Sequence, residues 1–298
     1  MRLVTFTHNG ADKIGALNAK SKTITDLKAA DPSLPSTMQA LIERGHDGLS
    51  QAQAAIDSAG EKARLSADDV VLKAPIPEPR RDVMAVGRNY HEHAQEFHDS
   101  GFDATSGATA VPDDPIIFTK ATTSVSGPFD PIPAYLDPTN STDYEGELAV
   151  IIGTGGRGIS RADAFDYVYG YTTSNDVTAR TLQHQHKQWF IGKGLDGYCP
   201  MGPVLLTADE AGHPDTFHLK TEVNGEIRQD SSCSALIFDI PTLIETISTG
   251  ITLLPGDIIV TGTPVGVGIG FKPPVFLKKG DVVRVDISPI GAIENVVE

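Results

Sequence analysis

The sequence has few cysteines and no long apolar run, and both absences restrict what the protein can be. Among 298 residues there are two cysteines, Cys199 and Cys233, which is too few for the disulfide framework of a small secreted domain. No segment approaches the roughly 20 apolar residues that span a bilayer, and the first residues run into an alternating pattern without a signal-type apolar core. We therefore expect a cytoplasmic protein with no membrane partner.

Positive charge is also scarce. The chain carries 24 lysines and arginines against 39 aspartates and glutamates, for a formal net charge of -15. Nucleic acids and anionic membrane surfaces require basic patches on their protein partners, so neither is expected to bind. A small anionic substrate would instead need local positive charge, from a metal ion or from a few basic side chains.

The first part of the chain reads as a small α/β module. Alternating residues at 3–7 and 14–17 predict two strands joined by a turn at Asn9-Gly10. The segments 38–44 and 51–62 are rich in Ala, Gln, Glu and Leu with partial helical spacing, which predicts helices. None of these segments carries an obvious set of chemically reactive side chains.

A proline-rich segment at 72–79 is typical of an extended linker. We therefore predict a small N-terminal domain at 1–72 and a catalytic domain at 73–298. Beyond the linker, short β-rich runs alternate with glycine and proline turns, and the runs 219–223 and 226–229 around Asn224-Gly225 predict a hairpin. The expected fold class is α+β, mainly β.

The clearest candidate for chemistry is a group of carboxylates. Glu145 and Glu147 are two apart at the start of an apolar run, 148–152, so as strand residues they share one face. Asp176 follows a second β-rich run, 167–173. Buried like charges repel, and a cation with all-oxygen ligands, such as Mg²⁺, Mn²⁺ or Ca²⁺, would stabilise them. The alternative is that the two glutamates lie on an ordinary solvated strand face.

His93 and Glu96 are three apart in a segment that reads as a short helix. They are neighbours on such a helix, and the carboxylate could orient the imidazole as a general base requires. Ordinary surface pairing explains the same spacing. The polar segment that follows, 97–112, could act as a lid over this pair.

Several groups could hold an anionic substrate. Lys193 lies in an apolar, glycine-flanked run, where a desolvated lysine pairs with a carboxylate or with a ligand; a lysine that extends to the surface is the alternative. At the end of a later strand, Gly262 and Thr263 offer backbone N–H groups and a hydroxyl. The glycine-rich segment 266–270 lacks a following helix to receive a pyrophosphate, so we do not expect nucleotide binding.

These stretches together resemble the fumarylacetoacetate hydrolase family, in the branch with a short N-terminal domain. They cover about residues 80 to 298 in the family's order and spacing. The resemblance implies a mixed β-sandwich roll, a homodimer, and Mg²⁺ or Mn²⁺ as cofactor, with Ca²⁺ able to take its place in crystals. The matching segments are 87–96 (GRNYHEHAQE), 144–149 (YEGELA), 175–180 (NDVTAR), 192–197 (GKGLDG) and 261–268 (TGTPVGVG).

The resemblance also assigns roles to single residues. Glu145, Glu147 and Asp176 match the metal ligands. His93 and Glu96 match a catalytic dyad on a short helix that orders when substrate binds. Lys193 matches the active-site lysine. Substrate contacts are expected from Tyr90, Arg180, Gln183, Lys193, Gly262 and Thr263.

The implied reaction is metal-dependent hydrolysis of a C–C bond in an acylpyruvate-type 1,3-dioxo acid, such as fumarylpyruvate. The metal would polarise the keto group and stabilise the enolate, His93 would activate water, and Lys193 would stabilise developing negative charge. Oxaloacetate decarboxylation and keto–enol tautomerisation need the same enolate and remain alternatives. A further alternative is a non-catalytic protein that binds 2-oxo acids.

Overall fold

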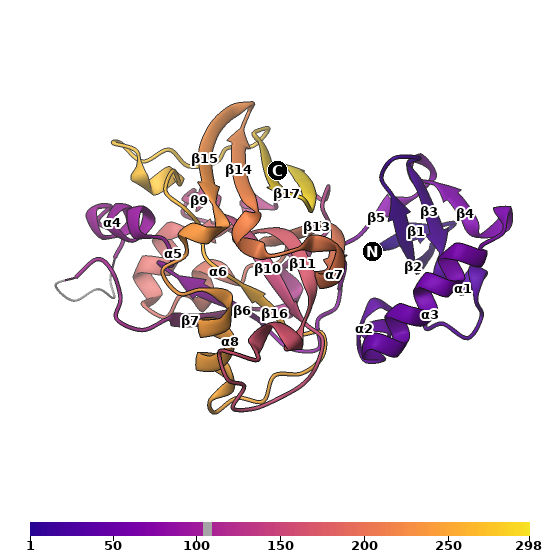
Figure 1. Cartoon of the computed structure of the whole chain (residues 1–298). Coiled ribbons are helices and arrows are strands. Elements are labelled where there is room, and N and C mark those ends of the chain that lie inside the picture. Colours follow the sequence, from indigo (N-terminus) through magenta and orange to yellow (C-terminus); the bar gives the residue numbers. More distant parts are fainter. Residues whose placement is uncertain (104–108) are drawn as a thin grey trace.

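The computed structural model describes residues 1–103 and 109–298. Figure 1 shows a larger body with the N-terminal module on one side of it. In this module β1 (Arg2–His8) and β2 (Ala11–Asn18) form the predicted hairpin. Asn9 and Gly10 both have positive φ, 52° and 75°, as a tight hairpin turn requires.

The helices of the module pack on one face of its strands. The predicted helix at 51–62 is wrong at both ends, because the real helix begins earlier and ends sooner. The chain after it is extended, with Ala59 and Gly60 at ψ values of 125° and 171°. The module's elements are α1 (Leu27–Ala30), α2 (Met38–Ile42), α3 (Gly45–Ser58), β3 (Thr23–Asp26), β4 (Arg64–Ser66) and β5 (Val71–Leu72).

One sheet runs through both parts of the molecule, in the strand order β4-β3-β2-β1-β13-β11-β10-β16-β6-β7. The module joins it where β1 pairs with β13 (Cys199–Thr207), with Arg2 opposite Leu206 and Leu3 opposite Leu205. The other strands are β6 (Val83–Gly87), β7 (Ile116–Lys120), β10 (Gly146–Ile152), β11 (Val168–Asn175) and β16 (Ile258–Val260).

A second sheet packs against the start of β10 and completes the sandwich. Its order is β15-β14-β17-β18, and its first two strands form the predicted hairpin around Asn224 and Gly225. Alternate residues of these strands are buried, including Val223 and Val285, which pack with Tyr144. The strands are β14 (His218–Val223), β15 (Glu226–Ser232), β17 (Val282–Ser288) and β18 (Gly291–Val296).

Helices border the end of the main sheet at which the carboxylates lie. α4 (His91–Asp99) follows β6, while α5 (Arg180–His186) and α6 (Phe190–Lys193) follow β11. Figure 1 shows α4 at the rim of the larger body. The remaining elements are α7 (Ala208–Ala211), α8 (Ile240–Ser248), β8 (Val125–Ser126), β9 (Thr142–Asp143) and β12 (Thr178–Ala179).

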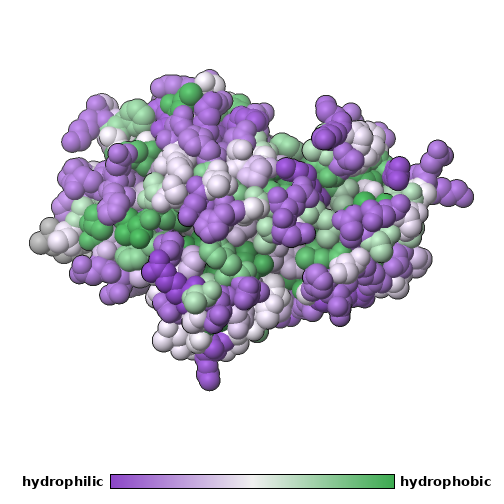
Figure 2. Space-filling view, in the orientation of Figure 1, coloured by the Kyte–Doolittle hydropathy of each residue, from purple (hydrophilic) through white to green (hydrophobic). Residues whose placement is uncertain are grey.

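The molecular surface is largely hydrophilic on the face drawn in Figure 2, with apolar side chains in separate patches. The helices of the described residues are all too short or too polar to cross a membrane. The mainly β, mixed fold predicted from the sequence is confirmed.

Gly146 sits where the two sheets touch, and its replacement by alanine tests this packing. A Cβ there would lie 2.2 Å from the Thr221 hydroxyl oxygen and 3.0 Å from a methyl carbon of Val285. We expect Gly146→Ala to lower the free energy of unfolding by about 1–3 kcal/mol, as overpacking does. Gly60→Ala is the control, since a Cβ there meets nothing within 4 Å. Urea titrations that gave equal stability for both variants would contradict this packing.

Candidate active site

Glu145, Glu147 and Asp176 come together at one end of the neighbouring strands β10 and β11. β10 and β11 are antiparallel neighbours, with Gly146 opposite Asn175, so the first residues of one strand lie beside the last of the other. All three side chains are buried, and one oxygen from each lies within 4.8 Å of the others. The solvated strand face that the sequence left open is therefore ruled out for both glutamates.

Cationic side chains surround this group. Lys193 Nζ donates to Glu145 Oε2 (2.8 Å) and to Asp176 Oδ2 (2.7 Å). Lys120, which is fully buried, donates to Asp176 Oδ1 (2.5 Å) and to the backbone oxygens of Val177 and Lys193. Lys193 is therefore buried and paired with Glu145 and Asp176. The alternative, a lysine that extends to the surface, is excluded.

The charges set the protonation states of these groups. Burial alone would raise the pKa of Glu145, but Lys193 and Arg180 outweigh it and hold the pKa below its usual value. Burial would lower the pKa of Lys193, yet Asp176 and Glu145 raise it above the ordinary range. Lys193 is therefore an ammonium group in this site, suited to stabilising negative charge.

Glu147 has no cationic partner among the described contacts. Its Oε2 accepts the Gly262 N–H at 2.5 Å, and burial, reinforced by Asp176 and Glu145, raises its pKa well above the usual value. A buried carboxylate in this position is costly unless a cation joins it. The three carboxylates therefore fit a hard divalent cation with oxygen ligands.

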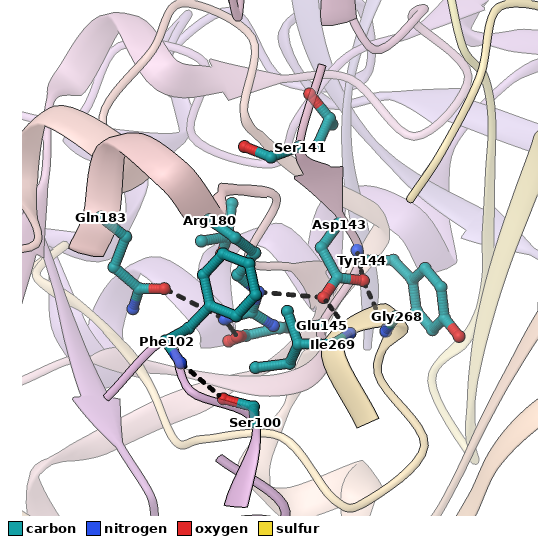
Figure 3. Close-up of polar contacts among 12 residues, drawn as sticks. Ser100, Phe102, Ser141, Asp143, Tyr144, Glu145, Arg180, Gln183, Gly268 and Ile269 are labelled. Carbon is teal, nitrogen blue, oxygen red and sulfur yellow. Dashed lines mark hydrogen bonds and ion pairs between the residues drawn. The ribbon is translucent and has the colours of Figure 1, made fainter. Parts of the chain in front are cut away.

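Arg180 and Asp143 form a second buried ion pair beside the carboxylates (Figure 3). Arg180 donates from Nε to Asp143 Oδ2 (2.9 Å) and from Nη1 to Glu145 Oε1 (2.6 Å). Its Nη2 is buried without a hydrogen-bond partner in the described part of the chain. Because Arg180 also lines the site cavity, that nitrogen is available to a ligand.

The predicted pair on the short helix is present as α4. His93 Nδ1 and Glu96 Oε2 are 2.9 Å apart, which leaves Nε2 of the imidazole to exchange protons if Nδ1 carries the hydrogen. The other Glu96 oxygen accepts the Gly266 N–H at 3.0 Å. The glycine-rich segment 266–270 thus contacts the dyad through Glu96.

These residues enclose a cavity of about 10 Å³, which is space for roughly one water molecule. Phe97 and Trp189 supply apolar walls, and their rings pack edge to face with centroids 5.8 Å apart. The predicted lid segment, 97–112, includes residues 104–108, which lie outside the described part. The predicted site residues that line the cavity are His93, Glu145, Arg180, Gln183, Lys193 and Thr263.

Two predicted substrate contacts lie elsewhere. Tyr90 is buried, its backbone pairs with that of Leu236, and it is not among the described residues that line the cavity. Gly262 offers its N–H to Glu147 instead of to the cavity. The hydroxyl of Thr263 donates to the Gly146 oxygen (2.9 Å) and accepts from Gln229 (2.7 Å), so a carboxylate could take its hydrogen only by breaking the first of these bonds.

Sequence reasoning missed three polar residues of the site. Lys120 ends a β-rich run, Asp143 directly precedes the Tyr144-Glu145 motif, and Gln229 belongs to a hairpin strand far along the chain. The only available signal was a charged residue at the end of an apolar run, for Lys120. Asp143 and Gln229 are identified only by their contacts in the folded chain.

Residues 82–298 match the family model described as fumarylacetoacetate (FAA) hydrolase C-terminal. Among curated proteins, the chain is 50% identical over 230 residues to oxaloacetate tautomerase YisK of Bacillus subtilis, covering 77% of this chain and 74% of that protein. It is 41% identical to mitochondrial oxaloacetate tautomerase fahd2 of Xenopus laevis, covering 99% and 89%.

Solved structures agree. A fumarylacetoacetate hydrolase from Exiguobacterium antarcticum is 41% identical, with a TM-score of 0.83 and coverage of 100% of this chain and 99% of that one. A maleylpyruvate hydrolase from a Sphingobium species, solved with manganese(II) and pyruvate, is 34% identical, with a TM-score of 0.77 and coverage of 100% and 98%. The chain therefore belongs to the fumarylacetoacetate hydrolase family, as its sequence motifs predicted.

Proposed function

We propose that this protein is a divalent-metal-dependent keto–enol tautomerase of a small 2-oxo dicarboxylic acid, with oxaloacetate as the leading substrate. The observation that carries the proposal is the buried group of three carboxylates beside an oriented histidine and a buried ammonium group. The names of the relatives from Bacillus subtilis and Xenopus laevis support the same reaction.

Glu145, Glu147 and Asp176 would hold the cation, which we propose to be Mg²⁺ or Mn²⁺. The excess of negative charge supports this: four buried carboxylates, Asp143 included, face three cationic side chains. When bound, the metal would polarise the keto group of the substrate and stabilise negative charge on its oxygen.

The chain itself would move the proton. Tautomerisation transfers one proton between C3 and the oxygen on C2, so it needs a base that can also act as an acid. His93 is suited to this because Glu96 fixes its Nδ1 side and leaves Nε2 to take up and return the proton. The Lys193 ammonium and Arg180 Nη2 would bind the anionic groups of the substrate and hold C3 near His93.

Hydrolysis of an acylpyruvate, the main expectation from the sequence, is less well supported. Hydrolysis requires an attacking water held beside the substrate, whereas tautomerisation requires no third reactant. The oxaloacetate tautomerases among the curated relatives favour the simpler reaction. The maleylpyruvate hydrolase among the relatives keeps C–C hydrolysis as a second candidate.

The homodimer and the cytoplasmic location expected from the sequence stay predictions. The curated relatives include a bacterial protein and one whose name places it in mitochondria. A binding protein without turnover is a weaker candidate, because a ligand binder has no need of an oriented base.

Metal binding is tested through stability. Glu147→Gln keeps an acceptor for the Gly262 N–H but removes the carboxylate that lacks a cationic partner in the described contacts. We expect the metal-free variant to melt at the wild-type temperature or above it. Saturating Mn²⁺ should raise the Tm of the wild type and not that of the variant, since only a folded-state ligand stabilises.

Asp137→Asn is the control for this experiment, because Asp137 is a buried aspartate that accepts the N–H groups of Thr139 and Ser141 away from the triad. It should keep the Mn²⁺ response. An equal Mn²⁺ response in Glu147→Gln and the wild type would exclude Glu147 as a ligand.

The reaction is tested with enol-oxaloacetate, oxaloacetate and fumarylpyruvate in the presence of Mg²⁺ or Mn²⁺. Ketonisation should give the highest kcat/KM of the reactions tested. Its rate is measured as the loss of enol absorbance, after subtraction of the uncatalysed rate. His93→Ala should lower it by about 10²- to 10⁴-fold, as loss of a general base does, while Mn²⁺ affinity is retained. His98→Ala, on the same helix, should have little effect. Faster cleavage of fumarylpyruvate than ketonisation would favour the hydrolase.

A further inference from the structure

Asp143 is fully buried, and both of its carboxylate oxygens are saturated with N–H donors. Oδ1 accepts from the backbone of Tyr144 (2.9 Å) and Gly268 (2.7 Å). Oδ2 accepts from the backbone of Ile269 (3.2 Å) and from Arg180 Nε (2.9 Å). Figure 3 shows these contacts converging on one carboxylate. Four donors therefore occupy the two oxygens of the Asp143 carboxylate.

On one side, Asp143 fixes the orientation of Arg180. The Nε bond to Asp143 and the Nη1 bond to Glu145 hold two edges of the planar guanidinium. The remaining nitrogen, Nη2, is the one without a partner among the described residues. Asp143 therefore determines that Nη2 is the nitrogen available to a ligand in the cavity.

On its other side, Asp143 binds the segment 266–270, which contacts the dyad helix α4 through Glu96. Gly268 and Ile269 donate to Asp143, while Gly266, two residues earlier, donates to Glu96 of the dyad. Gly270 lies so close that a Cβ on it would stand 1.9 Å from Glu96 Oε1. The segment 266–270 therefore contacts both Glu96 and Asp143.

We propose that Asp143 is a positioning residue that couples the seating of the dyad helix α4 to the orientation of Arg180. Asp143 touches neither the cavity nor the three carboxylates, and it acts through Arg180 and through segment 266–270. The coupling to substrate rests on the proposed function, in which Arg180 binds an anionic group. The effect of Asp143 on the position of α4 does not depend on the proposed function.

Asp143→Asn tests the proposal, because the asparagine amide must point its NH₂ group at two N–H donors in either orientation. The matched control is Asp257→Asn. Asp257 is also buried and accepts from an arginine, Arg81 Nε (2.8 Å), and from a backbone N–H, that of Leu254 (2.7 Å), at the far end of β16. Both substitutions remove a buried carboxylate that is paired with an arginine, but only Asp143 is paired with an arginine that lines the site cavity.

The first readout needs no ligand. Trp189 is the single tryptophan of the chain, and Phe97 of α4 packs on its ring. We expect Asp143→Asn to increase acrylamide quenching of Trp189 and to shift its emission to the red. The reason is that α4 would no longer be held against the segment 266–270, and Trp189 would become more accessible to solvent. Asp257→Asn should match the wild type.

The second readout is the affinity for oxalate, a small dianion, in the presence of Mg²⁺. We expect Asp143→Asn to weaken it by about 10- to 100-fold, the usual range for a hydrogen bond to a charged group, and Asp257→Asn to leave it unchanged. A double-mutant cycle with Glu96→Gln should show non-additive effects on quenching, although Asp143 and Glu96 make no direct contact among the described interactions.

If Asp143→Asn does not fold, Gly268→Ala takes its place, since the added Cβ would lie 2.6 Å from Asp143 Oδ1 and displace the same contact. Wild-type quenching and oxalate affinity in the variant that folds, or additive effects in the cycle, would overturn the proposal. Failure of the wild type to bind oxalate would count against the proposed function, and the ligand-free quenching of Trp189 would still decide the role of Asp143.

Discussion

The site depends on the balance of charge among side chains that are almost fully buried. Glu145, Glu147 and Asp176 lie together at one end of strands β10 and β11, and Lys193 donates hydrogen bonds to Glu145 and Asp176. Removing one partner from a buried ion pair costs about 3–5 kcal/mol, so the members of this cluster must be placed together. The antiparallel pairing of β10 with β11 does this, since it brings the beginning of one strand to the end of the other.

The second sheet matters to the chemistry through the residue between the two glutamates. Gly146 offers its N–H to Gln229 (3.0 Å) and its oxygen to Thr263 (2.9 Å), and Gln229 in turn donates to Thr263 (2.7 Å). These bonds join β15, β10 and the segment after β16 at one point. The backbone between the two glutamates is therefore held in place by hydrogen bonds to Gln229 and Thr263.

Local sequence pattern predicted a good part of this structure. The Asn9-Gly10 and Asn224-Gly225 hairpins, the mainly β fold and the pairing of His93 with Glu96 follow from short-range signals, namely turn chemistry and spacing within one element. The strand pattern offered Asp176 as a third carboxylate, and the family resemblance assigned it to the same metal site as Glu145 and Glu147, because sequence periodicity alone does not say which strands are neighbours.

What the sequence did not reveal was long-range. Lys120 meets Asp176 across 56 residues, and Asp143 meets Gly268 across 125. The pairing of β1 with β13, which carries the main sheet into the N-terminal module, is of the same kind. Such contacts depend on topology, and a lone aspartate or lysine has no local pattern that distinguishes a buried ion pair from a solvated side chain.

Few hydrogen-bonding groups of the described cavity residues are left without a partner in the protein. The Thr263 hydroxyl and Glu96 are already bound within the protein, and the groups of the described residues that can face a ligand include Arg180 Nη2, the Lys193 ammonium and the free side of His93. Under the proposed function, these groups would recognise negative charge and move a proton, as reactions that pass through an enolate require. Trp189 and Phe97 form the apolar wall of the cavity, so they would limit which substrates fit, while the three carboxylates would hold the metal ion.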